Sequence, residues 1–196
     1  MADYSIELSL GGLVAGVDEA GRGPLAGPVF AAAVILPPGL ENAGINDSKK
    51  LSAKRRDELF DFITRNAVAY CITSVDEKTI DQINILQATM LAMRKAIDGL
   101  VVKPDFVIVD GNKTPGSIYP EKAIVKGDSV SISIAAASIL AKVSRDRYLL
   151  KLDEQYPQYQ FAQHKGYGTK LHYEMLEKYG ISPVHRQSFL KKIINK

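Results

Sequence analysis

The stretch GVDEAGRGP at residues 16–24 constrains the fold of this chain more than any other part of the sequence. Apolar runs flank it at residues 13–15 and 29–36, and each run is typical of a buried strand. The stretch is therefore the end of one strand and the turn into the next. Its adjacent carboxylates, Asp18 and Glu19, repel each other beside a core that would desolvate them, so a bound cation would stabilise them.

The residue types around these two acids indicate a phosphate ligand bound together with a metal ion. Hard divalent cations prefer the oxygen ligands that carboxylates supply. Gly21 and Gly23 let the backbone approach a ligand closely, and the guanidinium of Arg22 between them matches phosphate geometry. A tight turn with solvated acids is the alternative. The glycines, the arginine and the apolar flanks favour metal-assisted chemistry on a phosphodiester.

The composition is that of a soluble protein with one domain, or one domain with an appendage. Of its 196 residues, 46% are hydrophobic, which is enough for a real core. A net charge of +3 permits a nucleic-acid partner without requiring one. The N-terminus lacks a signal-peptide pattern, and the apolar runs are too short to span a membrane. We therefore expect a cytoplasmic protein without membrane contact, and a lone cysteine, Cys71, in the core.

Apolar periodicity predicts an α/β layered domain. Residues 1–12 are interpreted as a strand or a short lead-in, because Ile6 and Leu8 alternate with polar neighbours. Strands at 13–18 and 28–36 are expected to form a hairpin. The further predicted elements are a helix over 52–65 capped by Ser52, a strand over 67–75, a helix over 83–100, strands at 106–109 and 123–125, a helix from 128 to about 155, and a helix over 170–179. This order predicts a mixed sheet covered by helices.

Three acidic positions each follow a short apolar run: Asp18 with Glu19, then Asp110, then Asp128. Ligands gather beyond strand ends in open α/β sheets, so neighbouring strands would bring four carboxylates to one spot. Two Mg²⁺ or Mn²⁺ ions would offset their charge. Taken alone, Asp110 also fits a turn, and Asp128 also fits a helix N-cap. Because successive strand side chains point to opposite faces, Asp18 and Glu19 are not expected to project alike.

Five motifs resemble bacterial ribonuclease HII, of the type 2 ribonuclease H family, and they occur in the family's order between residues 13 and 189. They are DEAGRGP at 18–24, NDSKKL at 46–51, VDGN at 109–112, KGD at 126–128 together with SIAAASILAK at 133–142, and HKGYGT at 164–169. None of the four acidic positions departs from the family's pattern.

The resemblance implies a ribonuclease H-like fold: a central five-stranded mixed sheet flanked by helices, with a C-terminal helical extension. It implies a catalytic core over 1–155 and a substrate-recognition part over 156–196, within one structural unit. It also implies metal-dependent cleavage of RNA in RNA–DNA hybrids, and incision 5′ of single ribonucleotides in duplex DNA. It further implies products with 3′-hydroxyl and 5′-phosphate ends, hydrolysis with two Mn²⁺ or Mg²⁺ ions, and roles in DNA replication and ribonucleotide excision repair.

The resemblance also assigns roles to residues. The catalytic, metal-binding acids would be Asp18, Glu19, Asp110 and Asp128. The backbone of Gly21-Arg22-Gly23 would contact the ribose 2′-hydroxyl and nearby phosphates, and Tyr167 would pack on the following deoxyribose. Physical reasoning agrees, since only the 2′-hydroxyl distinguishes RNA from DNA at one nucleotide and its reader must approach closely.

Basic residues are candidates for phosphate contacts, which would make binding salt-dependent. Lys49 and Lys165 lie in the resembling motifs and are placed in the binding site. Weaker candidates are Lys50, Lys126, Lys142 and Arg186. Residues 145–147 on the long helix are expected to form structural ion pairs. His164 is either a proton-transfer residue or a plain loop histidine, and the other two histidines show no zinc-site pattern.

The C-terminal run at 187–194 faintly resembles a sliding-clamp-binding peptide but lacks the usual paired aromatic residues. A basic tail near the substrate is therefore favoured over clamp binding. A monomer is the default expectation. The sequence does not choose between Mg²⁺ and Mn²⁺, or between single ribonucleotides and long hybrids, and it gives neither the rate nor the protein partners.

Two rival hypotheses remain open. A catalytically silent RNA–DNA binding module would be favoured by the loss of any one acid, and all four are present. A related nuclease acting on DNA alone would need no 2′-hydroxyl reader, so Gly21-Arg22-Gly23 and Tyr167 argue against it.

Overall fold

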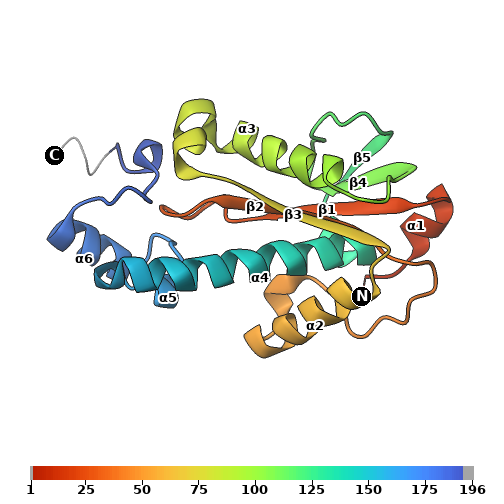
Figure 1. The fold of residues 1–196 in the computed structure, drawn as a ribbon, viewed down its shortest axis with the longest axis horizontal. Helices are drawn as coiled ribbons and strands as arrows, with labels where there is room; N and C mark the ends of the chain where they lie inside the picture. The colour runs from red at the N-terminus through yellow and green to blue at the C-terminus, as the bar shows by residue number, and fades with distance from the viewer. Residues whose placement is uncertain (1, 192–196) are drawn as a thin grey trace.

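A computed structural model describes residues 2–191, and its centre is one mixed five-stranded sheet (Figure 1). The strands lie in the order β3-β2-β1-β4-β5. Their bounds are β1 (Val14–Ala20), β2 (Val29–Ile35), β3 (Ala69–Val75), β4 (Phe106–Asp110) and β5 (Glu121–Ile124). The first three pair antiparallel, whereas β4 pairs parallel with β1 and β5 parallel with β4. The predicted five-stranded mixed sheet and its β1–β2 hairpin are confirmed.

Helices cover both faces of the sheet, with α3 on one face and α4 with α2 on the other (Figure 1). The α-helices are α1 (Ser5–Leu10), α2 (Ala53–Asn66), α3 (Glu77–Asp98), α4 (Ile132–Gln155), α5 (Phe161–His164) and α6 (Lys170–Tyr179). Short 3₁₀ turns are η1 (Ser48–Lys50), η2 (Gly127–Ser129), η3 (Pro157–Tyr159) and η4 (Gln187–Phe189). Ser52 caps α2 as predicted, since its side chain accepts a hydrogen bond from the Arg55 amide.

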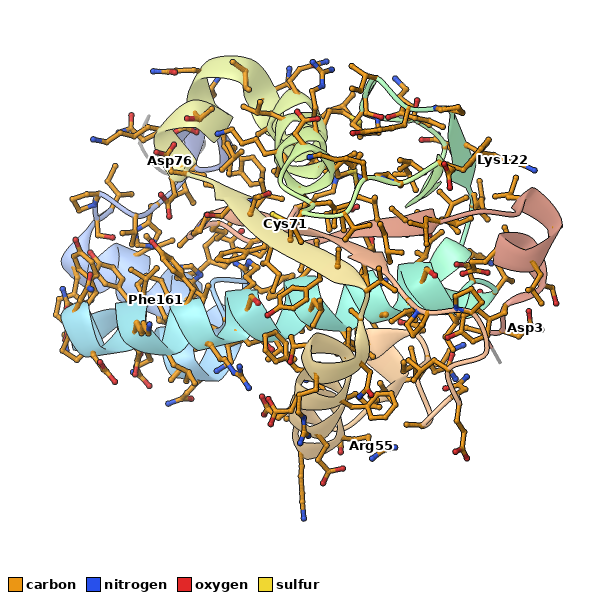
Figure 2. All side chains as sticks on the ribbon, turned by 45° about the vertical axis from the view of Figure 1, so that its right-hand side comes forward. Asp3, Arg55, Cys71, Asp76, Lys122 and Phe161 are labelled. Carbon is orange, nitrogen blue, oxygen red and sulfur yellow. The ribbon has the colours of Figure 1, made fainter. Side chains whose placement is uncertain are left out.

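The alternation of strand side chains divides the core into two layers. Val17 and Val109 face the α3 layer, where the lone Cys71 of β3 also packs (Figure 2). The α4 layer holds β2 side chains and an alanine-rich stripe of α4. The small stripe lets α4 approach β1 so closely that a Cβ built on Gly16 would lie 2.2 Å from the backbone carbon of Ser133.

The prediction of a strand near the N-terminus was wrong, because residues 5–10 form the helix α1. Ile6 and Leu10, four residues apart, pack on the same small core cluster. Leu8 is 69% exposed, so Ile6 and Leu8 do not share a buried face as the alternation suggested. The position of α1 is set by a tertiary contact of Glu7, described below, which no local pattern could indicate.

The predicted helix at 83–100 begins earlier than expected. Asp76 caps α3 by accepting from the Thr79 amide, and the helix is interrupted at Asn84, whose φ is 65°. The Asn84 side chain accepts from the amides of Leu86 and Gln87 and thereby starts the second part of the helix.

The C-terminal segment packs on the far end of α4 and on the turn that follows β1. A third core cluster joins Leu149 and Leu152 of α4 to Leu25 and Ala26 of that turn and to Phe161 of α5. This packing places the C-terminal residues beside the turn that carries the Gly-Arg-Gly motif. Within residues 2–191, no helix combines the length and hydropathy needed to cross a membrane.

Candidate active site

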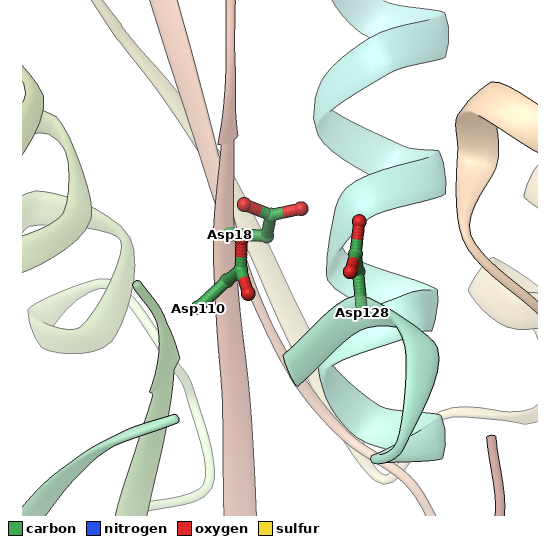
Figure 3. A group of neighbouring side chains, drawn as sticks. All are labelled: Asp18, Asp110 and Asp128. Atoms are coloured by element: carbon green, nitrogen blue, oxygen red, sulfur yellow. The ribbon is translucent and has the colours of Figure 1, made fainter. Parts of the chain in front are cut away.

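The strand register brings Asp18 and Asp110 side by side near the C-terminal ends of β1 and β4. The last parallel pair between β1 and β4 joins Val17 to Val109, and both acids come one residue later. Because the two valines face α3, the two aspartates face α4. The predicted convergence of these strand ends is confirmed (Figure 3).

The turn η2 carries Asp128 to the same place from the α4 side (Figure 3). One carboxylate oxygen each of Asp18, Asp110 and Asp128 lies within 4.8 Å of the others. The Gly127 amide donates to Asp110 Oδ1 at 2.6 Å, which ties the turn to the end of β4. Asp128 is not the N-cap of α4; Ser131 takes that position by accepting from the Ile134 amide.

The N-terminal segment holds the loop that carries Asp128. Glu7 Oε1 accepts from Ser131 Oγ at 2.6 Å and from the Ser133 amide at 3.0 Å. The main chain of Asp3 also bonds to Val130 and Ile132. Sequence reasoning missed this clasp, formed by Asp3 and Glu7, because the contacting residues lie more than 120 positions apart.

Glu19 lies next to the three aspartates but does not belong to their cluster. It follows Asp18 in β1 and pairs with Arg22 at 3.5 Å. It lines a cleft of about 240 Å³ together with Asp18 and Asp110. Three of the four predicted acids therefore line one cleft, and Asp128 lies close enough to Asp18 and Asp110 to bind one ion with them.

The electrostatics of the cluster suit a divalent cation. Burial, and then the charges of Glu19 and Asp110, raise the pKa of Asp18 well above the usual value of an aspartate. Burial and Asp110 likewise raise the pKa of Asp128, although Lys49 Nζ lies 3.5 Å from its Oδ2. The carboxylate repulsion that raises these pKa values would be relieved by a cation, and the carboxylates are a hard oxygen donor set, so Mg²⁺ or Mn²⁺ fits the residues present.

We expect the affinity for Mn²⁺ to fall by about tenfold or more between about pH 7.5 and pH 5. The raised pKa of Asp18 means that its proton competes with the metal at higher pH than at an ordinary aspartate. Calorimetric titration with Mn²⁺ at the two pH values measures the change. Equal affinity at both would contradict the assignment of Asp18 as a ligand.

A buried arginine holds the Gly-Arg-Gly turn in place. Arg186 is fully buried and donates to the carbonyl oxygens of Gly21, Arg22 and Gly27 at 2.7–2.9 Å. These carbonyls therefore face inward, and residues 21–23 line the cleft on their other side. The expectation that Arg186 contacts phosphate was wrong, because its guanidinium is enclosed by the backbone of this turn.

Arg145 on α4 holds the later part of the same turn, around Ala26 and Pro28. Its guanidinium donates to the carbonyl oxygens of Ala26, Pro28 and Lys165 at 3.0–3.3 Å. The prediction that it forms an ion pair was wrong. Its neighbours do form the predicted pairs, Asp146 with Lys142 at 2.7 Å and Arg147 with Asp57 at 2.9 Å.

The remaining predicted binding residues occupy different places. Tyr167 and Lys49 line the cleft. Tyr167 as a residue is 43% exposed, and its ring lies under the Arg145 guanidinium at 5.8 Å. Lys165 lies outside this cleft, since its amine donates to the Ala162 carbonyl and borders a separate groove beside Arg147. The side chain of Lys165 is therefore turned away from the carboxylates.

The sequence model of the family described as ribonuclease HII matches residues 15–192. This chain belongs to the ribonuclease HII family. A ribonuclease HII of Caldicellulosiruptor bescii is 56% identical over 182 residues, which cover 93% of this chain and 88% of the relative. The chain is a nuclease of the ribonuclease H type, a class that depends on divalent metal ions.

Solved structures of ribonuclease HII proteins share the fold. The ribonuclease H2 of Pyrococcus horikoshii superposes with a TM-score of 0.76 at 30% identity, over 90% of this chain and 93% of that one. A ribonuclease HII of Archaeoglobus fulgidus, solved in complex with PCNA, gives a TM-score of 0.71 at 27% identity, over 89% and 93% of the two chains. The predicted ribonuclease H-like architecture is confirmed.

Proposed function

We propose that this protein cuts the RNA strand of RNA–DNA hybrids and incises duplex DNA on the 5′ side of a single ribonucleotide, leaving 3′-hydroxyl and 5′-phosphate ends. One observation carries the proposal. Asp18 and Asp110 of the acid cluster line the same cleft as the Gly-Arg-Gly turn and Tyr167. One phosphodiester bound in the cleft could therefore contact both the metal-binding carboxylates and the backbone of residues 21–23.

The acids would hold two divalent ions during the reaction, with Asp18, Asp110 and Asp128 as the principal ligands and Glu19 beside them. Bound divalent ions supply activation of a water molecule and stabilisation of the leaving oxygen. Lys49, which borders the cleft beside Asp128, adds positive charge for a phosphate. Gly23, where an added Cβ would meet only Tyr167 at 3.9 Å, leaves room for the sugar to approach the main chain, as recognition of a 2′-hydroxyl requires, whereas the missing Cβ of Gly21 makes room for the Arg145 side chain.

A labelled DNA duplex with one ribonucleotide tests the proposal, incubated with Mg²⁺, Mn²⁺ or chelator beside an all-DNA duplex. We expect a metal-dependent cut immediately 5′ of the ribonucleotide and none in the control. Binding without a cut in either metal would support the silent binding module instead. Equal cutting of the all-DNA duplex would contradict the role of residues 21–23.

Tyr167→Ala is expected to reduce cleavage at a single ribonucleotide by about tenfold or more, and cleavage of a long hybrid by much less. The exposed ring is the aromatic surface of the cleft on which a deoxyribose can pack, and a long hybrid offers ribose there instead. Initial rates on both substrates measure the ratio, with Tyr173→Ala, an equally exposed tyrosine outside the cleft, as the matched control. Equal losses on both substrates would refute this role.

The other finer expectations remain part of the proposal: a recognition part over 156–196 acting with the core over 1–155, action as a monomer and a cytoplasmic location. Clamp binding is not included. In the segment at 187–194, Leu190 is buried, Phe189 packs on two core clusters, and residues 192–194 lie outside the described part of the chain.

A further inference from the structure

All three histidines of the chain lie together in the C-terminal segment, away from the acids. The rings of His164 and His172 stack with centroids 4.2 Å apart, and His185 lies 5.2 Å from His172. All three are buried, with Phe161 packed against each of them. None of them lines the cleft, so they do not act on substrate directly.

Hydrogen bonds define where the proton of each ring sits. The backbone amide of Ser182 donates to His185 Nδ1 at 2.9 Å, so that nitrogen carries no proton, and the Ser182 hydroxyl at 2.7 Å can only donate to it. The proton of neutral His185 is therefore on Nε2, which faces His172 Nε2 at 3.0 Å. His172 Nε2 must accept, which leaves its proton on Nδ1, and Nδ1 donates to the carbonyl oxygen of Tyr167 at 2.9 Å. The bonds run one way, from Ser182 through His185 and His172 to Tyr167.

The same reasoning gives the position of the proton on His164. The Gly166 amide donates to His164 Nδ1 at 3.1 Å, and His164 Nε2 donates to the Tyr159 carbonyl at 2.8 Å. Each ring thus donates once and accepts once as a neutral imidazole. Burial lowers the pKa of His172 and of His185 to about 4, so both rings are neutral near pH 7.

One member of the chain of bonds, His185, adjoins a residue that holds the Gly-Arg-Gly turn. His185 precedes Arg186, whose guanidinium binds the carbonyls of Gly21 and Arg22. The same segment pairs its backbone with the turn, through Gly27 N to Val184 O at 2.9 Å and Arg186 N to Leu25 O at 2.8 Å. His185 therefore connects through His172 to Tyr167, and Arg186 connects to the Gly-Arg-Gly turn. Tyr167 and this turn both line the cleft.

We propose that His172 and His185 are positioning residues, which set the main chain of Tyr167 relative to the Gly-Arg-Gly turn through this directed pair of hydrogen bonds. The proposal rests on the function proposed above for Tyr167 and for residues 21–23. His172 Nδ1 is the side-chain donor to the Tyr167 carbonyl, which also accepts from the Thr169 amide at 2.8 Å. Its orientation is fixed by His185, which cannot accept at Nε2 while Ser182 donates to Nδ1.

Nitrogen-15 NMR of the three histidines near pH 7.5, without metal, tests the geometry in the unaltered protein. We expect His172 protonated on Nδ1 alone, and His164 and His185 protonated on Nε2 alone. Each resonance is assigned by its loss in a variant in which that one histidine is replaced. A His172 proton on Nε2, a doubly protonated ring, or the averaged signals of a free imidazole would overturn the proposal.

A matched pair of variants tests the consequence for substrate choice. His172→Asn places an amide donor where Nδ1 stands, whereas His172→Gln reaches the Nε2 position and has no donor at the Tyr167 carbonyl. We expect the glutamine variant to lower the ratio of single-ribonucleotide to long-hybrid cleavage by about fivefold or more, because the Tyr167 carbonyl loses the donor that connects it to His185 and keeps only the local Thr169 amide. The asparagine variant should keep the ratio within about twofold.

Failure of the inference and failure of the proposed function give different results. If Tyr167→Ala lowers the ratio and His172→Gln does not, or if both His172 variants lower it equally, the inference is overturned and the function of Tyr167 stands. If Tyr167→Ala itself leaves the ratio unchanged, the proposed function of Tyr167 fails, and the inference about substrate choice fails with it.

Discussion

Replacing Asp110 by asparagine is expected to reduce cleavage of a ribonucleotide-containing duplex by about 1,000-fold or more. A lost metal ligand removes several kcal/mol of transition-state stabilisation, and each 1.4 kcal/mol is about tenfold in rate. The asparagine keeps an oxygen for the Gly127 amide, which now donates to Oδ1 at 2.6 Å, so the turn that carries Asp128 stays in place. Binding of the duplex, measured in chelator, should be largely retained.

The same change should stabilise the metal-free protein, by about 1 kcal/mol. Asp110 is one of the charges that raise the pKa of Asp18 and of Asp128, so its removal relieves repulsion in the cluster. Thermal unfolding in chelator measures this effect. A lower melting temperature in chelator, or substantial remaining cleavage in Mn²⁺, would each contradict the assignment of Asp110 to a shared ion site.

Gly16→Ala should lower the free energy of unfolding by about 3 kcal/mol or more, and the melting temperature by about 10 °C. The new Cβ would lie 2.2 Å from the Ser133 backbone carbon and 2.4 Å from the Ile134 amide nitrogen. Neither atom belongs to a side chain that can turn aside, so β1 and α4 must separate. Since Ser133 lies at the start of α4, the affinity for Mn²⁺ should fall as well.

Gly23→Ala is the matched control for this stability measurement. A Cβ at Gly23 has no heavy atom nearer than Tyr167 Cε1 at 3.9 Å, and the residue does not need a positive φ. Its unfolding free energy should stay within about 0.5 kcal/mol of the unaltered protein. Equal melting temperatures for the two alanine variants would show that the strand and helix can part without cost.

Sequence patterns predicted the strands and helices that bury apolar side chains at regular spacing. The hairpin of β1 and β2, the capped helix α2 and the long helix α4 all show their period in the sequence, because packing against a sheet selects it residue by residue. The convergence of Asp18, Asp110 and Asp128 was predictable for the same reason, since each acid follows a short apolar run at a strand end or helix start. The match of the ribonuclease HII family to residues 15–192 agrees with the motifs that suggested it.

What the sequence did not reveal depends on contacts between distant segments. Arg145 and Arg186 look like surface cations, yet each is enclosed by carbonyl oxygens of the turn after β1. The histidines at 164, 172 and 185 have no metal-site spacing, and their hydrogen-bonded arrangement exists only once α5, α6 and the following loop have folded together. A local pattern carries no signal for such partners, because their neighbours in sequence do not determine their neighbours in space.

The clasp that Asp3 and Glu7 place on residues 130–133 limits how far the chain can be shortened. A minimal nuclease cut to begin at β1 would retain all four acids and every residue that the family model matches. It would nevertheless lose the carboxylate that binds Ser131 and Ser133, three and five positions after Asp128. Residues 3–10 thus support the turn that carries Asp128, more than a hundred positions downstream, and a bulky fusion placed against α1 would disturb that support directly.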